Sequence, residues 1–147
     1  MENLSKLPER LKELMFYREQ IKPEELASRI GVCGSTVREW LNGTCLITLK
    51  NALLLADFFQ CSLNYLAGMT ENYETVVPKP LPPFYTHLRF VMDEKKISRY
   101  RIVKDTCLHD VYFTRWSKGA DPELISVVRI ADYLQVSLDY LVGRRDY

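Results

Sequence analysis

Apolar residues recur at helical spacing in a series of short segments along the chain. Leu11, Leu14 and Ile21 fall on one face of a helix expected over residues 10–20. No segment combines sustained alternation of apolar and polar residues with flanking turn signals, which is the pattern typical of a strand. The hydrophobic pattern therefore predicts an all-α fold.

Two further short helices follow in the first half of the chain. The segment 22–25, Lys-Pro-Glu-Glu, predicts a helix start, because proline suits the first turn and acids lie beside the positive end of the helix dipole. Gly31 ends this helix, at a place that favours a left-handed residue. A third helix over residues 35–42 buries Val37 and Trp40.

The fourth and fifth helices are marked by capping residues. Thr48 can cap a fourth helix through its side-chain oxygen, and Ser62 can cap a last short turn in which Leu63 and Leu66 point inward. The inward stripe of the fourth helix is expected to consist of Leu49, Leu53, Ala56 and Phe59.

The sequence repeats itself. Trp40 matches Trp116 at an offset of 76, and after a one-residue deletion the segment 62–68 matches 137–143 at an offset of 75. A duplicated unit of about 60 residues on either side of a linker predicts two domains rather than a solenoid. Between the copies, Pro78, Pro80, Pro82 and Pro83 mark a semi-rigid linker. We expect one domain over residues 1–70, the linker over 71–83 and a second domain over 84–147.

The second copy predicts the same series of helices. Ser98 caps its second helix, whose Ile102 and Val103 face the core, and Phe113 and Trp116 anchor its third helix. The stripe of its fourth helix is Leu124, Val128, Ala131 and Leu134.

Composition narrows the class of protein. The net charge of +1 excludes a protein that coats nucleic acid by bulk charge, so any polyanion-binding surface must be local. The charged N-terminal segment does not resemble a signal peptide, and the longest apolar run is too short to cross a membrane. The cysteines and histidines lack metal-site spacing. We expect a soluble cytoplasmic protein without a metal or cofactor.

The segment 24–43 resembles the helix-turn-helix of the XRE family, the Cro and lambda-repressor type, and the tail 130–143 resembles the end of the same domain. Ala27 supplies the small residue where the two helices cross, and Gly31 supplies the turn. Together with the repeat, this resemblance implies two tandem five-helix, lambda-repressor-like domains of a bacterial or phage-like DNA-binding protein. It also implies that the third helix of the domain enters the major groove.

The resemblance assigns base-reading positions to this chain. In the first copy these are Gly34, Ser35, Thr36, Arg38 and Glu39, while Asn42 and Thr44 can reach phosphate. In the second copy the corresponding positions are Asp110, Val111, Tyr112, Thr114 and Arg115, with Lys118 just beyond.

The second copy departs from the family pattern. Val103 replaces the small alanine, and Cys107 replaces the turn glycine, which costs about 1 kcal/mol if the left-handed geometry is kept. Asp110 is unfavourable near phosphates unless it accepts a hydrogen bond from a cytosine amine. These departures affect base reading by the second copy rather than its fold.

Local charge, in contrast, favours the second copy as the stronger phosphate-binding surface. Residues 95–118 hold seven basic and two acidic side chains, a net of +5, whereas residues 19–42 have a net of −1. Arg99 stands where the family often places a phosphate-binding glutamine. Lys95 and Lys96 either contact phosphate or form ordinary solvated surface. We expect both copies to touch DNA, with the second supplying more of the affinity.

These observations predict a sequence-specific, double-stranded DNA-binding transcriptional regulator, a repressor in type, that works as a homodimer or as an intramolecular pseudo-dimer. The connection from Thr70 to Phe84 can extend to about 45 Å, enough for half-sites about 34 Å apart. The alternative is a protein-interaction module, antirepressor-like or antitoxin-like, in which one or both units bind protein. An enzyme is not expected, because the sequence shows no metal cluster, phosphate loop or acid–base pair. No small-molecule ligand is evident.

Overall fold

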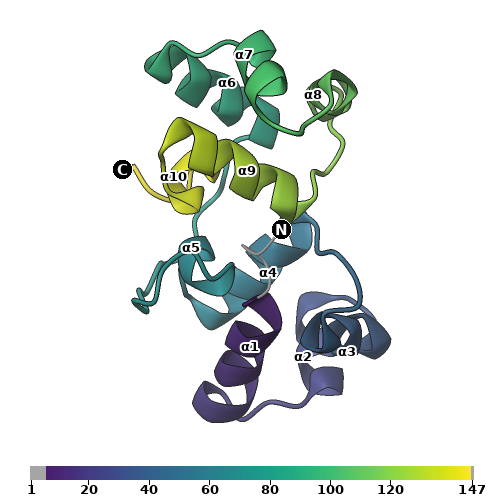
Figure 1. The fold of residues 1–147 in the computed structure, drawn as a ribbon. Helices are drawn as coiled ribbons and strands as arrows, with labels where there is room; N and C mark the ends of the chain where they lie inside the picture. Colours follow the sequence, from purple (N-terminus) through teal and green to yellow (C-terminus); the bar gives the residue numbers. More distant parts are fainter. Residues whose placement is uncertain (1–5, 147) are drawn as a thin grey trace. The chain divides into compact units, whose positions relative to one another are not determined.

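The computed structural model describes residues 6–146, and the chain divides into two compact units, Met1–Val77 and Pro78–Tyr147 (Figure 1). Residues 6–146 form helices, turns and irregular segments with no strand, so the all-α expectation is confirmed, and an isolated β-bridge joins Cys61 and Thr75. Within this same range, no helix has the length and apolar character needed to cross a bilayer.

Unit 1 contains α1 (Leu7–Lys12), the π-helix η2 (Glu13–Arg18), α2 (Pro23–Ile30), α3 (Gly34–Asn42), α4 (Leu49–Phe59) and α5 (Leu63–Leu66). The first helical segment begins earlier than expected, and its second half is π-helical. α3 packs against both α1 and α2, α5 packs against α1 and α4, and α2 touches α4. The core therefore holds α3 by one face only.

Three local signals in unit 1 act as expected. Gly31 adopts the left-handed conformation at φ 83°, and a Cβ built there meets no atom within 4 Å, so its role is conformational. The Thr48 hydroxyl accepts the backbone N–H of Asn51 at 3.3 Å, and the Ser62 hydroxyl accepts that of Tyr65 at 3.0 Å.

The apolar stripe of α4 was predicted incorrectly at one position. Leu53 is only half-buried, whereas Ala52 and Leu55 are buried together with Leu49, Ala56 and Phe59. Successive helical residues point about 100° apart. The buried face is centred between Ala52 and Ala56, and this centre turns Leu53 toward the edge.

Residues 70–76, which we call the strap, pack on unit 1 although most of them fall within the predicted linker. The backbone N–H of Ser62 donates to the Glu74 carbonyl at 3.1 Å, the N–H of Val76 donates to the Gln60 carbonyl at 3.0 Å, and Val76 is buried. Strap residues also bond to helix side chains. The extended chain before α6 is therefore shorter than the sequence indicates, and its reach is less than about 45 Å.

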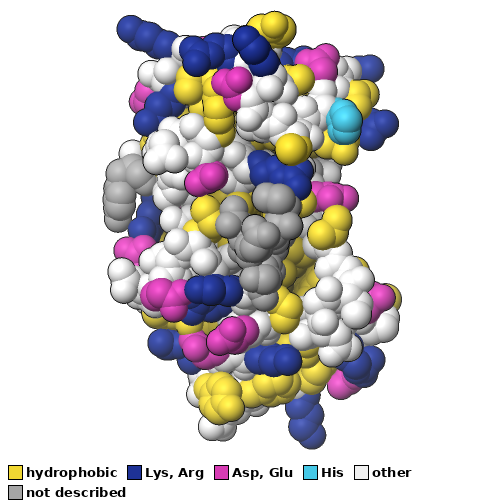
Figure 2. Space-filling model, in the orientation of Figure 1, with side chains coloured by type: hydrophobic (Ala, Val, Ile, Leu, Met, Phe, Trp, Pro, Cys, Tyr) yellow, Lys and Arg dark blue, Asp and Glu magenta, His cyan; other side chains and the backbone are white. Residues whose placement is uncertain are grey.

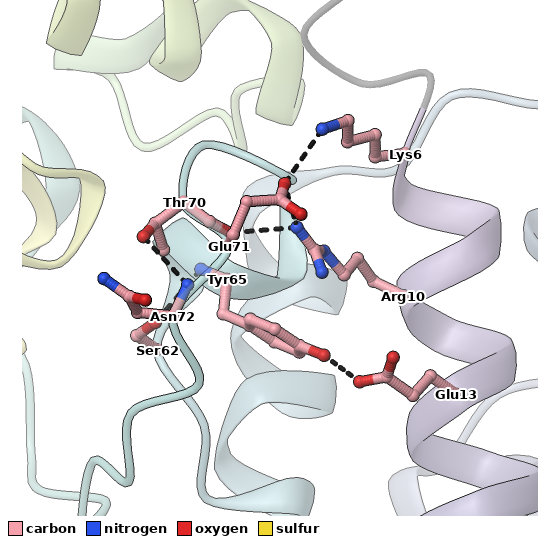
Figure 3. Close-up of polar contacts among 8 residues, drawn as sticks. All are labelled: Lys6, Arg10, Glu13, Ser62, Tyr65, Thr70, Glu71 and Asn72. Carbon is pink, nitrogen blue, oxygen red and sulfur yellow. Dashed lines mark hydrogen bonds and ion pairs between the residues drawn. The ribbon is translucent and has the colours of Figure 1, made fainter.

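Polar side chains from the first helix fasten the strap (Figure 3). Arg10 donates to the Thr70 carbonyl at 2.9 Å and to the Glu71 carboxylate at 2.9 Å, and the Lys6 ammonium lies 2.9 Å from the same carboxylate. These cations hold the pKa of Glu71 below its ordinary value, with the hydrogen bond from Lys6 as the largest cause. Beside the strap, Tyr65 of α5 donates a hydrogen bond to Glu13 of η2.

Unit 2 contains α6 (Phe84–Lys95), α7 (Arg99–Asp105), α8 (Asp110–Ser117), α9 (Leu124–Leu134) and α10 (Leu138–Val142). Ser98 accepts the N–H of Arg101 at 3.2 Å, as expected of a cap. Ile102 is buried, but Val103 is only half-buried, contrary to expectation, because it sits about 100° round the short helix from Ile102. The predicted stripe of the fourth helix, Leu124, Val128, Ala131 and Leu134, is buried throughout.

The turn between α7 and α8 differs from the glycine turn of unit 1. Thr106 is extended, at φ −121° and ψ 177°. Its hydroxyl donates to the Ile102 carbonyl at 2.6 Å and accepts the Leu108 N–H at 3.2 Å. Cys107 is not among the residues with positive φ. The cost of about 1 kcal/mol expected for a left-handed Cys107 does not arise, because Cys107 does not adopt that conformation.

Candidate nucleic-acid interface

The helix α3 turns one face to the core and the other outward. Val37 and Trp40 are fully buried, as the sequence indicates, and they fix the rotation of α3 about its own axis. The outward face carries hydrogen-bonding side chains in successive turns, as contact with base edges requires. Of the positions assigned to base reading, Ser35, Arg38 and Glu39 are exposed, and Gly34 and Thr36 are half-buried.

Asn42 and Thr44 lie at the opposite end of α3 from Gly34. Asn42 is the last residue of the helix, about 12 Å along its axis from Gly34. Thr44 closes this end, because its N–H donates to the Glu39 carbonyl at 3.0 Å and its hydroxyl lies 3.4 Å from the same oxygen. Both side chains are exposed, but they are separated from the group at the start of the helix.

An ion pair joins the outer face of α3 to the first turn of α2. The Arg38 guanidinium contacts the Glu24 carboxylate, and both side chains are more than half exposed, at 53% and 60%. A Cβ built on Gly34 would lie 3.5 Å from the Glu24 carboxylate and 3.7 Å from the Arg38 guanidinium. The pair therefore lies beside the first residue of α3.

Sequence reasoning missed this pair, since it assigned Glu24 and Glu25 to helix-dipole stabilisation alone. Glu25 does remain on its own helix, where its carboxylate lies 3.9 Å from Arg29. Glu24 instead reaches across to α3. The available signal was an acid in the first turn of one helix and an arginine on the outer face of the next, in a motif whose two helices cross.

In unit 2, α8 is anchored by Phe113 and Trp116, both buried. Tyr112 is half-buried, with its ring centroid 5.5 Å from that of His109 and 6.2 Å from that of Trp116. It therefore packs partly among aromatic rings. Of the other assigned positions, Asp110, Arg115 and Lys118 are exposed and Thr114 is half-buried.

Arg99 bridges the start of α7 to α8. Its Nε donates to Asp110 Oδ1 at 2.7 Å, and its Nη2 donates to the Asp110 carbonyl at 2.8 Å and to Thr114 Oγ1 at 2.7 Å. The hydrogen bond to Asp110 is the main cause that raises the pKa of Arg99. The residue expected to bind phosphate is therefore already bound to two of the predicted reading residues.

Other basic residues of unit 2 stand at helix ends. Lys95 ends α6, Lys96 follows it in the left-handed conformation at φ 58°, and both residues are exposed and precede α7. Figure 2 shows Lys and Arg side chains, in dark blue, over the helices α6 and α7. Within residues 6–146, Lys95, Lys96, Arg115 and Lys118 form no ion pair.

Comparison with known proteins finds a similarity to a known family over part of unit 1. Residues 14–66 match the family described as Helix-turn-helix, from η2 through α5, and no second copy is matched. At the general level this match supports a DNA-binding transcription regulator of XRE type, in a family that is generally non-enzymatic. No curated protein and no solved structure gives a match.

Proposed function

We propose that this chain is a sequence-specific regulator that binds double-stranded DNA and represses transcription by occupying its operator. The observation that carries the proposal is the outward face of α3, in the segment that matches the helix-turn-helix family. Buried Val37 and Trp40 hold that face outward, with Ser35, Arg38 and Glu39 on it. In this proposal the start of α3 enters the major groove.

Unit 2 adds phosphate contacts and a second reading helix in this proposal. Arg115 and Lys118 are exposed cations at the outer face and end of α8, and Lys95 and Lys96 precede α7. Each phosphate contact contributes affinity without sequence information, whereas base-edge contacts from α8 give selectivity. The two units then act as an intramolecular pseudo-dimer, or two chains pair as a homodimer.

In a second candidate function, unit 2 binds protein instead of DNA. Tyr100 is 72% exposed and Val111 is 47% exposed, and they directly follow the bonded residues Arg99 and Asp110. Large apolar side chains exposed on two helices that pack together are more typical of a protein contact than of a phosphate-binding surface. Under this alternative α3 alone reads bases.

Selection of bound duplexes from a random DNA library, with the full chain at near-physiological salt, tests the proposal. We expect two enriched half-sites, with Arg38→Ala relaxing one and Arg115→Ala relaxing the other. Arg29→Ala is the matched control, because Arg29 is an exposed arginine of α2 whose ion pair, with Glu25, lies on its own helix. Enrichment of no sequence would contradict the proposal.

The same selection separates the two candidate functions of unit 2. A single enriched half-site that Arg38→Ala abolishes, and that Arg115→Ala and Val111→Asp leave unchanged, assigns base reading to α3 alone. That result favours the protein-binding alternative for unit 2. Two half-sites, of which Arg115→Ala relaxes one and Arg38→Ala the other, exclude it, because α8 then contributes its own sequence preference.

A further inference from the structure

An arginine–carboxylate pair lies at the start of the reading helix in both units, but with the charges exchanged. In unit 1 the carboxylate belongs to α2 and the arginine to α3, as Glu24 and Arg38. In unit 2 the arginine belongs to α7 and the carboxylate to α8, as Arg99 and Asp110. The shared feature is therefore an arginine–carboxylate pair at the start of the reading helix, although the residues of the two pairs do not correspond to one another at the repeat offset.

The two guanidinium groups also occupy related positions. At the repeat offset of 76 residues, Thr114 corresponds to Arg38. The Arg99 Nη2 lies 2.7 Å from Thr114 Oγ1, so unit 2 brings a guanidinium from α7 to the side chain that stands in the place of Arg38. Each unit thus holds one guanidinium beside its reading helix and neutralises it with one carboxylate.

Structural stabilisation is a weak explanation for these pairs. The side chains of Glu24 and Arg38 are more than half exposed, and those of Asp110 and Arg99 are 67% and 32% exposed. Ion pairs in water-accessible positions contribute little to the stability of a fold. The two ion pairs have a larger effect on the binding of DNA than on stability, because both pairs lie on the surface that the proposed function assigns to DNA.

An unpaired arginine at this place strengthens binding to every DNA sequence. Each phosphate that a cation neutralises releases counterions, and this gain does not depend on the bases. An arginine that already faces a carboxylate gains less from a phosphate, and the carboxylate adds repulsion. This loss of DNA-binding free energy is offset only where base contacts form. The pair therefore lowers the affinity for non-specific DNA more than the affinity for the specific site.

We propose that Glu24 and Asp110 are specificity-determining residues that suppress binding to non-specific DNA by neutralising Arg38 and Arg99. The proposal rests on the proposed DNA-binding function and assigns a role to acidic residues within it. It differs from the sequence interpretation, in which Glu24 stabilises the dipole of α2 and Asp110 is tolerated only opposite a cytosine.

The test uses Glu24→Gln and Asp110→Asn in the full chain, with binding to a random-sequence duplex and to the selected duplex measured across a salt series. Each variant is expected to steepen the slope of log affinity against log salt by about 0.9 for the random duplex. Between 50 and 200 mM salt, this steeper slope lowers the affinity for the random duplex by an additional factor of about three to four. The ratio of specific to non-specific affinity is expected to fall.

Matched variants separate this effect from a general change in charge. Glu25→Gln removes one acid from the same turn of α2, and Asp93→Asn removes one exposed acid near the end of α6. A double-mutant cycle with Arg38→Ala provides the second control, since Glu24→Gln is expected to lose its excess effect once Arg38 is gone. Circular dichroism verifies that each variant retains its helical content.

The outcomes distinguish this inference from the proposed function. If the wild type selects a DNA sequence but Glu24→Gln and Asp110→Asn change the salt slope no more than Glu25→Gln and Asp93→Asn do, the inference is wrong and the regulator proposal stands. If the wild type binds no DNA at any salt concentration, the proposed function fails and the inference fails with it.

Discussion

At the scale of single residues, α3 separates side chains that hold the helix from side chains that face outward. Trp40 is buried among its neighbours, whereas Ser35 is exposed one helical turn and a half earlier. The two positions therefore make different contributions, one to stability and the other to the proposed base contacts. Substitution of each residue by alanine can measure them separately.

Trp40→Ala is expected to lower the free energy of unfolding of unit 1 by about 3–5 kcal/mol, because it leaves a large cavity in the core. Ser35→Ala is expected to change it by less than about 0.5 kcal/mol and to weaken binding of the selected duplex instead. Denaturant unfolding and duplex titration of both variants check this. Equal loss of stability in the two variants would contradict the division.

Glu71 gives a pH-dependent test of the strap. Because Lys6 and Arg10 lower its pKa from the ordinary value of 4.5, its contribution to stability is present above that value and is lost as pH falls through the lowered pKa. We expect the difference in unfolding free energy between wild type and Glu71→Gln to be constant near neutral pH and to shrink below pH 4.5. A difference that does not vary with pH would show that Glu71 is not held by these cations in solution.

At the scale of elements, the turn between α2 and α3 and the turn between α7 and α8 are closed by different means. The turn of unit 1 depends on the left-handed Gly31, whereas that of unit 2 uses the Thr106 hydroxyl and has no left-handed residue at Cys107. Gly31→Ala is therefore expected to destabilise unit 1 by about 1–2 kcal/mol. Cys107→Ala, the matched change in unit 2, is expected to be nearly neutral. Thermal or denaturant unfolding of the two variants measures the contrast.

What the sequence predicts at this scale depends on whether the signal is local. The ends of α2 and α4 could be predicted, because Gly31 and Thr48 act within a few residues of themselves. The pairs Glu24–Arg38 and Arg99–Asp110 could not, because they depend on how two helices cross. The strap was missed for the same reason, since its polar composition resembles a linker until Gln60 and Ser62 are placed beside it.

At the scale of the whole molecule, the chain that joins the units limits which DNA sites both can bind at once. With Val76 packed on unit 1 and α6 beginning at Phe84, only residues 77–83 remain between them. Seven residues span at most about 25 Å. If both units read DNA as a pseudo-dimer, their joint binding depends strongly on the spacing of the two half-sites.

We expect tight binding when the half-sites lie one helical turn apart on one face of the duplex. Insertion of five base pairs moves one half-site to the opposite face, and insertion of ten adds about 34 Å, which exceeds the reach of residues 77–83. Both insertions are expected to reduce affinity to that of a single half-site. Titration with sedimentation analysis checks this, since a pseudo-dimer places one chain on each duplex and a homodimer places two. Affinity that is insensitive to both insertions would show that the units do not bind DNA jointly through this connection.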